Sequence, residues 1–305
     1  MKKRSFFKGV VLVLAAAVIA GGALYFYPAW RAAKKLEENL DFGDFSYRLE
    51  VELKKEELDS GQQRVLGILA ELTGFEEGAM YCYTITGSVW DDTIHALIYP
   101  KGASEPLFEL YLSEELDVIN EAMLYNVVRR NLLKENALLN FIVPVQEKDM
   151  YMSLEQVEKL FHIDLTSAKT FTSPVANTRF TVMQYFWGLA TMAHEENEKG
   201  ESFRAVTDRA QMDLELAEGE EEFVVEVTFS VEDPAEVLVE NEQLLKGLGF
   251  DLSDERMRIL KRLSVYAVSG EGRGFQMPTE FVSQDVIDII SGIRGLLSNP
   301  AKGSS

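Results

Sequence analysis

The sequence predicts an α+β protein with one long antiparallel sheet, preceded by an N-terminal transmembrane helix. Three observations support this prediction. Residues 9–27 contain no charged side chain. Residues 44–53 alternate between apolar and polar side chains, the pattern of a half-buried strand. Further strand-like runs follow one another across short turns, with helices in blocks between them, which favours an antiparallel sheet over a doubly wound one.

The start of the chain predicts a membrane anchor. Residues 1–8 carry four basic side chains, and residues 9–27 would form a helix about 28 Å long, close to the thickness of a bilayer's hydrocarbon core. Tyr25, Tyr27 and Trp30 fall where the aromatic belt would lie, at the outer interface of the cell membrane. Because a short basic N-terminus normally stays in the cytoplasm, we expect a single-pass protein of the cell membrane, with its C-terminal domain outside in a bacterial envelope.

A cleaved signal peptide is the alternative. The basic start, the apolar core of residues 10–20 and the small residues near Val18-Ile19-Ala20 fit one. The apolar stretch continues to Tyr27, however, and is longer than a typical signal core, which favours an uncleaved anchor. Either interpretation exports the remainder of the chain.

Composition indicates one folded domain. The 305 residues are 47% hydrophobic, and no Gly/Pro/Ser-rich linker divides them. The expected segments are a cytoplasmic N-terminus (1–8), a transmembrane helix (9–27), a membrane-proximal helix or linker (28–43), an extracytoplasmic α+β domain (44–298) and a loose tail (299–305).

Charge and cysteine content exclude several classes of partner and linkage. The net charge of −20 produces a field that repels phosphate backbones, so we expect no nucleic-acid partner. Cys82 is the only cysteine, so the chain has neither an internal disulfide nor the cysteine of a lipoprotein anchor.

The first half of the domain combines helices with a strand meander. Gly74 ends one helix, and Ser153-Leu-Glu-Gln156 is a capping box that opens another, which runs to Phe161. The predicted strands are residues 44–53, 79–90, 93–99, 106–112 and 150–152, and the other predicted helices are residues 62–73 and 121–134.

The second half contains the clearest hairpin, which together with the first meander could extend a single sheet. A helix is expected to begin at Asp233-Pro234, where proline occupies a preferred first position. The predicted strands are residues 206–216 and 223–229, with a strand or hairpin at 265–275, and the other predicted helices are residues 180–198, 254–263 and 283–297.

This layout resembles the convex-sheet carriers of bacterial envelopes, the LolA/LppX-like group. The resemblance rests on the anchored N-terminus, the meander of residues 81–89, 94–99 and 107–112, the strand-to-helix step at 150–156, and the strand–Pro278–helix ending. In that group a strongly curved antiparallel sheet wraps apolar helices, and the cavity between them takes up lipid or acyl chains. The resemblance therefore implies one long, curved sheet packed on helices over about residues 44–297. It carries over no functional residue, and this chain lacks the lipid-anchor cysteine of many members.

Catalytic and metal motifs are absent from the sequence. His194 begins His-Glu-Glu-Asn-Glu, which lacks the second histidine of a zinc protease, and we expect His194 at the surface of a charged helix end. No serine nucleophile elbow occurs, and the glycines of residues 270–274 favour a turn over a phosphate loop. We expect no catalytic residue, metal or cofactor.

A cysteine–histidine pair fails on geometry. If Asp91 and Asp92 form the hairpin turn, His95 lies opposite Ser88, and Cys82 lies about 20 Å further along its strand. A Ser88–His95 contact stays open, although such cross-strand pairs are usually ordinary surface.

Two segments are more apolar than their positions require. Residues 180–192 are apolar almost all round, and residues 138–145 are a short apolar run containing a proline. Plain core packing is one interpretation. The other is a groove for an acyl chain or a partner segment, with these lining residues: Phe141, Ile142, Met183, Phe186 and Trp187.

The leading hypothesis is a non-catalytic, membrane-tethered envelope module that binds a lipid or acyl ligand or another envelope protein. One alternative is a structural subunit of a membrane assembly, in which Gly21 and Gly22 would let a second helix approach closely. The other is a hydrolase that uses acidic residues which the sequence does not place.

Overall fold

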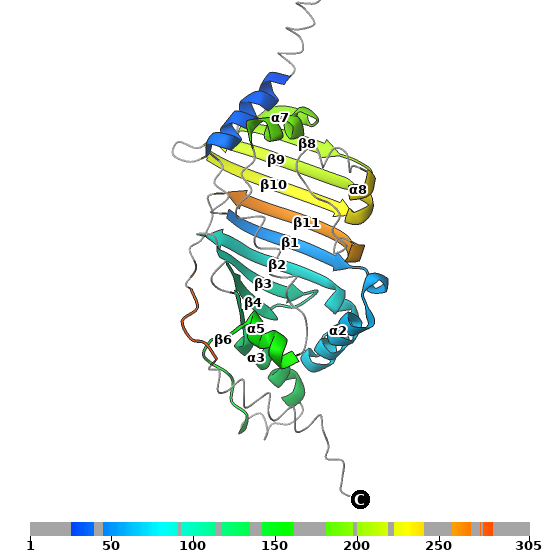
Figure 1. The fold of residues 1–305 in the computed structure, drawn as a ribbon, viewed down its shortest axis with the longest axis vertical. Coiled ribbons are helices and arrows are strands. Elements are labelled where there is room, and N and C mark those ends of the chain that lie inside the picture. The colour runs from blue at the N-terminus through cyan, green and yellow to red at the C-terminus, as the bar shows by residue number, and fades with distance from the viewer. Residues whose placement is uncertain are drawn as a thin grey trace, which may run out of the picture.

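The computed structural model describes residues 26–39, 45–90, 93–113, 117–134, 142–161, 181–197, 200–218, 223–240, 258–269, 275 and 277–282. It has an α+β fold built on one eleven-stranded antiparallel sheet (Figure 1). Its strands are β1 Phe45–Leu53, β2 Cys82–Trp90, β3 Thr93–Pro100, β4 Phe108–Leu112, β5 Asp117–Asn120, β6 Tyr151–Ser153, β7 Ala193–Asn197, β8 Gly200–Val206, β9 Ala210–Glu218, β10 Phe223–Glu232 and β11 Leu260–Ser269.

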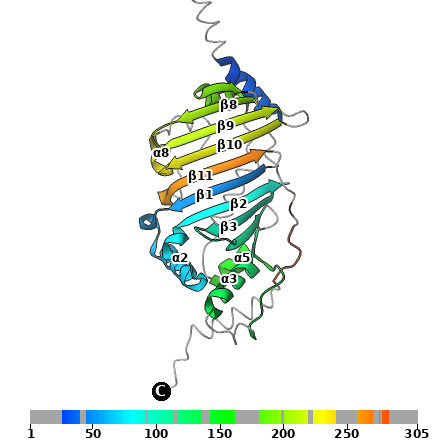
Figure 2. The ribbon, with the colours of Figure 1, turned by 180° about the vertical axis from the view of Figure 1, so that it is seen from behind.

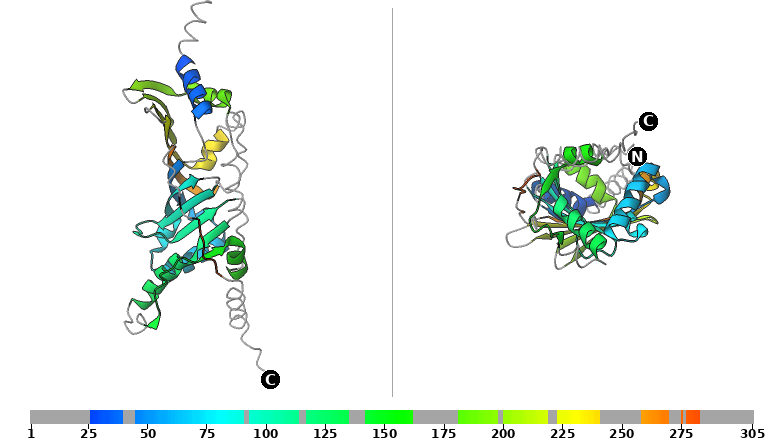
Figure 3. Two further views of the ribbon diagram at one scale, coloured as in Figure 1. Left: turned by 90° about the vertical axis from the view of Figure 1, so that its left-hand side faces the viewer. Right: turned by 90° about the horizontal axis from the view of Figure 1, so that it is seen from below.

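The described helices are concentrated at the two ends of the sheet. Their bounds are residues 26–39, η1 Lys55–Glu57, α2 Ser60–Thr73, η2 Glu77–Tyr81, α3 Glu121–Leu133, α5 Leu154–Phe161, α7 Val182–Ala190 and α8 Pro234–Glu240. Helices α2, α3 and α5 lie at the β6 end, whereas helix 26–39 and α7 lie at the β7 end (Figure 1; Figure 2). Helix 26–39, α7 and α8 share one side of the sheet (Figure 3).

The strand order is β6-β5-β4-β3-β2-β1-β11-β10-β9-β8-β7. Every pair of neighbours is consecutive in sequence, except β1 and β11 in the middle. There Phe45 lies opposite Ser269, and Val51 opposite Leu263. The first and second halves of the chain therefore build separate ends of the sheet, and these two strands join them.

Alternation along each strand defines an inner face, which carries most of the apolar side chains. Leu49 of β1 lies opposite Ile85 of β2 and Val265 of β11, and the same parity continues to Leu214 of β9 and Phe203 of β8. Helices cover this face near both ends. One buried core joins helix 26–39 and α7 to β8, β9 and β10, and another joins α2 and α3 to Met80 and Leu107.

Local sequence signals are confirmed. Gly74 ends α2 in the left-handed conformation, with φ of 76°. Ser153 and Gln156 form the predicted capping box, with reciprocal hydrogen bonds of 2.9 and 3.1 Å. The register of β2 on β3 places Ser88 opposite His95, as the hairpin geometry predicts.

The prediction of one helix over residues 180–198 is wrong. Helix α7 ends at Ala190, and Ala193–Asn197 forms the edge strand β7. The backbone of this polar segment pairs with β8, with His194 opposite Phe203. Tertiary pairing therefore overrides the helical pattern, and His194 lies on a strand rather than on a helix end.

The helix predicted over residues 254–263 is also wrong in its described part. Residues 260–263 belong to β11, where Leu263, Val265 and Ala267 alternate onto the inner face. Residues 79–81 form the end of η2 instead of a strand, and Val206 ends β8, so it does not share a strand with Ala210. The helix predicted at 283–297 lies outside the described residues.

Gly87 lets two strands and a tyrosine meet. A Cβ atom at this position would lie 1.9 Å from the carbonyl oxygen of His95. The hydroxyl of Tyr47, which is opposite Gly87 on β1, donates a 2.9 Å hydrogen bond to that same oxygen. Burial raises the pKa of this hydroxyl above its usual value. Only glycine fits between the tyrosine and the neighbouring strand.

Candidate functional site

Helix 26–39 is part of the folded domain. Its small and apolar side chains recur at helical spacing and are buried against α7 and the inner face of the sheet: Ala29, Ala32, Ala33 and Leu36. Three alanines let the helix backbone approach closely, and Leu36 reaches the core that contains Leu189 and Phe203. The residues that follow the uncharged run therefore dock directly onto the sheet.

Beside this buried stripe, side chains of helix 26–39 and of α7 form an exposed apolar surface. Its members, called the aromatic surface below, are Phe26, Tyr27, Trp30, Met183 and Trp187. Both Tyr27 and Trp187 are 57% exposed. Five large apolar side chains exposed on two adjoining helices differ from the scattered singles of an ordinary soluble surface.

Phe186 connects the two parts of the aromatic surface. Its ring centroid lies 6.1 Å from that of Phe26 and 5.7 Å from that of Trp30, in edge-to-face arrangements. It lies 5.3 Å from the ring of Trp187. These four aromatic rings are therefore contiguous across the helix pair.

Basic side chains border the aromatic surface. The guanidinium of Arg31 lies 6.0 Å from the ring centroid of Tyr27, and the amine of Lys34 lies 6.0 Å from that of Trp30. Such positions allow weak cation–π attraction and keep the charges in contact with water. Aromatic rings beside lysine and arginine are the side chains that membrane interfaces favour.

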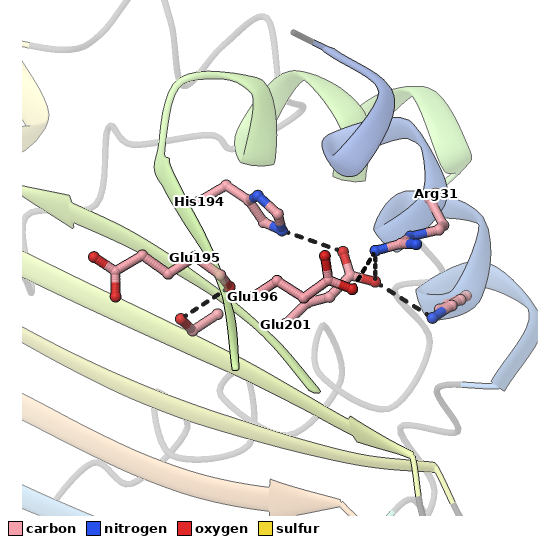
Figure 4. A network of polar contacts seen from close by, with 7 residues as sticks. Arg31, His194, Glu195, Glu196 and Glu201 are labelled. Atoms are coloured by element: carbon pink, nitrogen blue, oxygen red, sulfur yellow. Dashed lines mark hydrogen bonds and ion pairs between the residues drawn. The ribbon is translucent and has the colours of Figure 1, made fainter. Parts of the chain in front are cut away.

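A buried carboxylate lies behind the aromatic surface, on the inner face of β8. Figure 4 shows Arg31 and His194 pointing toward Glu201. Glu201 is only 5% exposed, and its carboxylate oxygens lie 3.0 Å from Arg31 Nη2, 3.3 Å from Lys35 Nζ and 3.4 Å from His194 Nε2. Arg31 Nη2 also lies 3.5 Å from Glu196.

The cations of helix 26–39 neutralise Glu201. Its hydrogen bond with Arg31 raises the pKa of the guanidinium above its ordinary value. A buried carboxylate is tolerated only when such partners are present, because desolvation of an unpaired charge costs several kcal/mol. The ion pairs, the alanine packing and a 3.0 Å hydrogen bond from the backbone N–H of Val182 to Glu37 together hold helix 26–39 in place.

A second buried carboxylate, Glu109 of β4, lies near the other end of the sheet and on its outer face. It accepts hydrogen bonds from Tyr111 (3.1 Å), Asn120 (2.8 Å) and Tyr151 (3.2 Å). The ring nitrogen Nε2 of His95 lies 2.9 Å from it. Burial would raise the pKa of Glu109, but the hydrogen bonds from His95 and Asn120 outweigh this and hold the pKa below its ordinary value.

The surroundings of Glu109 are typical of a structural polar core. The His95 ring stacks on the Tyr111 ring, with centroids 4.6 Å apart. It also contacts the Phe275 ring, at a centroid distance of 5.2 Å. Burial, followed by the charge of Glu109, raises the pKa of Tyr111 to about 12. Residues 280–282 lie along the edge strand β6. The backbone N–H of Tyr151 donates a 3.1 Å hydrogen bond to the carbonyl oxygen of Glu280.

The positions of Cys82, Ser88 and His95 follow from the pairing of β2 with β3. Cys82 is far along β2 from His95, and its carbonyl accepts a 2.8 Å hydrogen bond from the N–H of Lys101. Ser88 is opposite His95, but the Nε2 atom of His95 faces Glu109. Among the described residues, no group of three or more His, Cys, Asp and Glu side chains is arranged to hold a metal ion.

The structure brings together part of the predicted groove. Met183, Phe186 and Trp187 lie on α7, where the Phe186 ring contacts Trp30 of the predicted membrane interface, and Tyr27 is exposed on the same helix as Trp30. Tyr25 and Phe141 lie outside the described residues.

Ile142 does not join this set. It is 63% exposed at the β6 end, where the carbonyl oxygens of Val143 and Pro144 accept hydrogen bonds from Arg129 and Tyr125 of α3. The described residues therefore provide two separate apolar surfaces, and not one groove lined by both segments.

Two residues of the candidate site were missed from sequence. Phe26 lies near the end of the uncharged run, and the sequence predicts for it only a place in the membrane span. Glu201 and Phe203 lie two residues apart on β8 and therefore share its apolar face. The sequence pattern could thus have indicated a carboxylate on that face. Its cationic partners on helix 26–39 are too distant in sequence to be inferred.

No protein-family model, curated protein or solved structure matches the chain. Within the described ranges, no helix combines the length and apolar character needed to cross a bilayer. Most of the predicted span, residues 9–25, lies outside those ranges. The chain is thus defined by its α+β fold, its long antiparallel sheet and the aromatic surface at the β7 end.

Proposed function

We propose that the chain is a non-catalytic module of the bacterial cell envelope, tethered to the membrane by residues 9–27. It binds a lipid or acyl ligand, or another envelope protein, through the aromatic surface. The observation that carries this proposal is the exposure of Phe26, Tyr27, Trp30 and Trp187 at the place where the uncharged run ends.

Exposed aromatic side chains suit such a role. Each large apolar side chain left in water forgoes roughly 1.5–3 kcal/mol of burial free energy, which a ligand or partner recovers on binding. Met183 and Trp187 add an adaptable thioether and a rigid amphipathic ring to the same surface.

The architecture is compatible with the carrier resemblance. A long antiparallel sheet with helices on its apolar side is the arrangement in which such carriers hold lipid, and the central inner-face residues Leu49, Val265 and Ile85 remain only partly buried.

Reporter fusions test the tether and its orientation. A reporter that is active only outside the cytoplasm, fused after Ser305 of the full chain, is expected to be active. A reporter active only in the cytosol at this position would overturn the tethered-envelope proposal. Deleting residues 9–20 provides the matched control, because loss of the span should retain the reporter inside.

Native mass spectrometry of the full chain tests the ligand. We expect lipid to accompany the wild-type protein and the Trp90→Ala control, whose tryptophan is exposed on β2 well away from α7. Trp187→Ala should lose most of this lipid. Equal lipid occupancy in all three proteins would exclude the aromatic surface as the binding site.

A further inference from the structure

We infer that α7 itself docks on the outer leaflet of the bilayer beside the tether, so that Met183 and Trp187 insert at the membrane interface. This deepens the proposed function and rests on it, because residues 9–27 are taken to span the membrane. The occupant of the aromatic surface is then the lipid headgroup layer, and the domain stands on the β7 end of its sheet.

The position of α7 relative to the end of the uncharged run supports this arrangement. Phe26 and Tyr27 are the last two residues of that run. The Phe186 ring of α7 contacts the rings of both Phe26 and Trp30. A bilayer that surrounds the residues just before Phe26 must therefore also pass close to Trp187. A separate protein partner would have to displace lipid from this place.

The attachment between the two helices is rigid. Val182 and Leu189, at the two ends of α7, pack in the same core as Ala32, Ala33 and Leu36. The pairing of Arg31 and Lys35 with Glu201 fixes the helix to β8 as well. Because helix 26–39 cannot swing freely on the sheet, α7 keeps its place beside the membrane exit.

The chemistry of the surface fits lipid headgroups. Two tryptophans, a tyrosine, a phenylalanine and a methionine provide apolar bodies, and the tryptophans and the tyrosine also carry a polar N–H or O–H group. The ammonium group of Lys34 lies beside the Trp30 ring. In this position it can reach the lipid phosphates while the Trp30 ring lies deeper in the membrane interface. Two exposed acids nearby are already engaged: Glu196 pairs with Arg31, and Glu37 accepts the backbone N–H of Val182.

The charge of the chain favours zwitterionic over anionic lipid headgroups. The whole chain carries a net charge of −20, which anionic lipids repel. On helix 26–39, Arg31 and Lys35 pair with Glu201, whereas Lys34 lies beside the Trp30 ring of the aromatic surface. With ten strand spacings between β7 and β6, each about 4.8 Å, the α2–α3 end would stand roughly 48 Å from the bilayer.

The three tryptophans of the chain provide the test. Trp30 and Trp187 belong to the aromatic surface, and Trp90 is exposed on β2, five strands from β8 in the sheet order. Full-length single-tryptophan variants, with the other two tryptophans changed to phenylalanine, are reconstituted in vesicles of phosphatidylcholine. Quenching is compared between ordinary lipid and lipid brominated high on its acyl chains. Thermal unfolding checks that each variant folds.

Docking of α7 predicts that Trp187 loses as large a share of its emission as Trp30, whereas Trp90 loses little. Quenching of Trp30 without Trp187 would overturn the docking of α7 and leave the tether intact. If Trp30 is also unquenched and the chain does not float with the vesicles, the tether itself fails. Equal quenching of all three tryptophans would show that the domain touches lipid without the inferred orientation. That result would also overturn the docking of α7.

Discussion

The two ends of the sheet each contain a buried carboxylate, and the two are stabilised in different ways. Glu201, near the β7 end, is matched by formal positive charges from Arg31 and Lys35, which lie on a helix distant in sequence. Glu109, near the β6 end, is held by two tyrosines, an asparagine and a histidine on neighbouring strands. Glu201 therefore joins helix 26–39 to the sheet, whereas Glu109 consolidates the sheet itself.

The largest effect is expected at Glu109. Glu109→Ala leaves the donors of Tyr111, Tyr151 and Asn120 without their acceptor, and the free energy of unfolding should fall by about 3–5 kcal/mol. Urea unfolding of the full chain measures this. Glu105→Ala, which removes an exposed ion pair with Arg130, is the control and should change stability by less than about 1 kcal/mol.

A smaller loss, about 2–3 kcal/mol, is expected for Glu201→Ala, because Arg31 and Lys35 remain partly exposed and can regain water. Hydrogen exchange should become faster in helix 26–39 and remain unchanged in α3. Glu196→Ala, at an exposed position, should affect neither. Equal loss of protection at both ends would contradict the role of Glu201 as a local joint.

Acid should affect the Glu109 cluster through its carboxylate. Its folded-state pKa is lowered, so its contribution to stability is complete above the ordinary glutamate pKa of about 4.3 and is lost as the pH falls through the folded-state value. The free energy of unfolding of the wild type should thus fall more steeply below about pH 4.3 than that of Glu109→Gln. Parallel pH profiles would contradict this linkage.

Replacing each of two glycines by alanine should change the stability of the domain in opposite directions. Gly188 in α7 has open space where a Cβ atom would lie, so Gly188→Ala should stabilise the domain by about 0.5–1 kcal/mol. Gly74, at the end of α2, has φ of +76°, and a Cβ atom would lie 2.3 Å from Asn131 Oδ1. Gly74→Ala should therefore destabilise it, by about 1–3 kcal/mol. Thermal unfolding of both variants measures the difference.

Features set by neighbouring residues were predictable from sequence. The alternation of β1, the register of Ser88 on His95, the stop at Gly74 and the capping box at Ser153 all depend on side chains a few residues apart. The antiparallel α+β class follows from them, because short turns allow only such pairing.

Features set by distant residues were not predictable. Ala193–Asn197 is polar and becomes a strand only because β8 offers its edge, and the pairing of β1 with β11 has no local signal. At the site, Tyr27, Trp30, Met183, Phe186 and Trp187 were recognised by composition alone. Their assembly into one surface, and the separation of Ile142 from it, depend on which end of the sheet each helix covers.

The central pairing of β1 with β11 has a consequence for how the protein acquires its structure. During synthesis Phe45 emerges long before its partner Ser269, so the sheet cannot be completed until nearly all of its strands exist. Contacts this distant in sequence slow folding, because chain entropy is lost before they form. We expect β1–β6 and β7–β10 to collapse as separate units, and the zipping of β11 between them to limit the rate of folding.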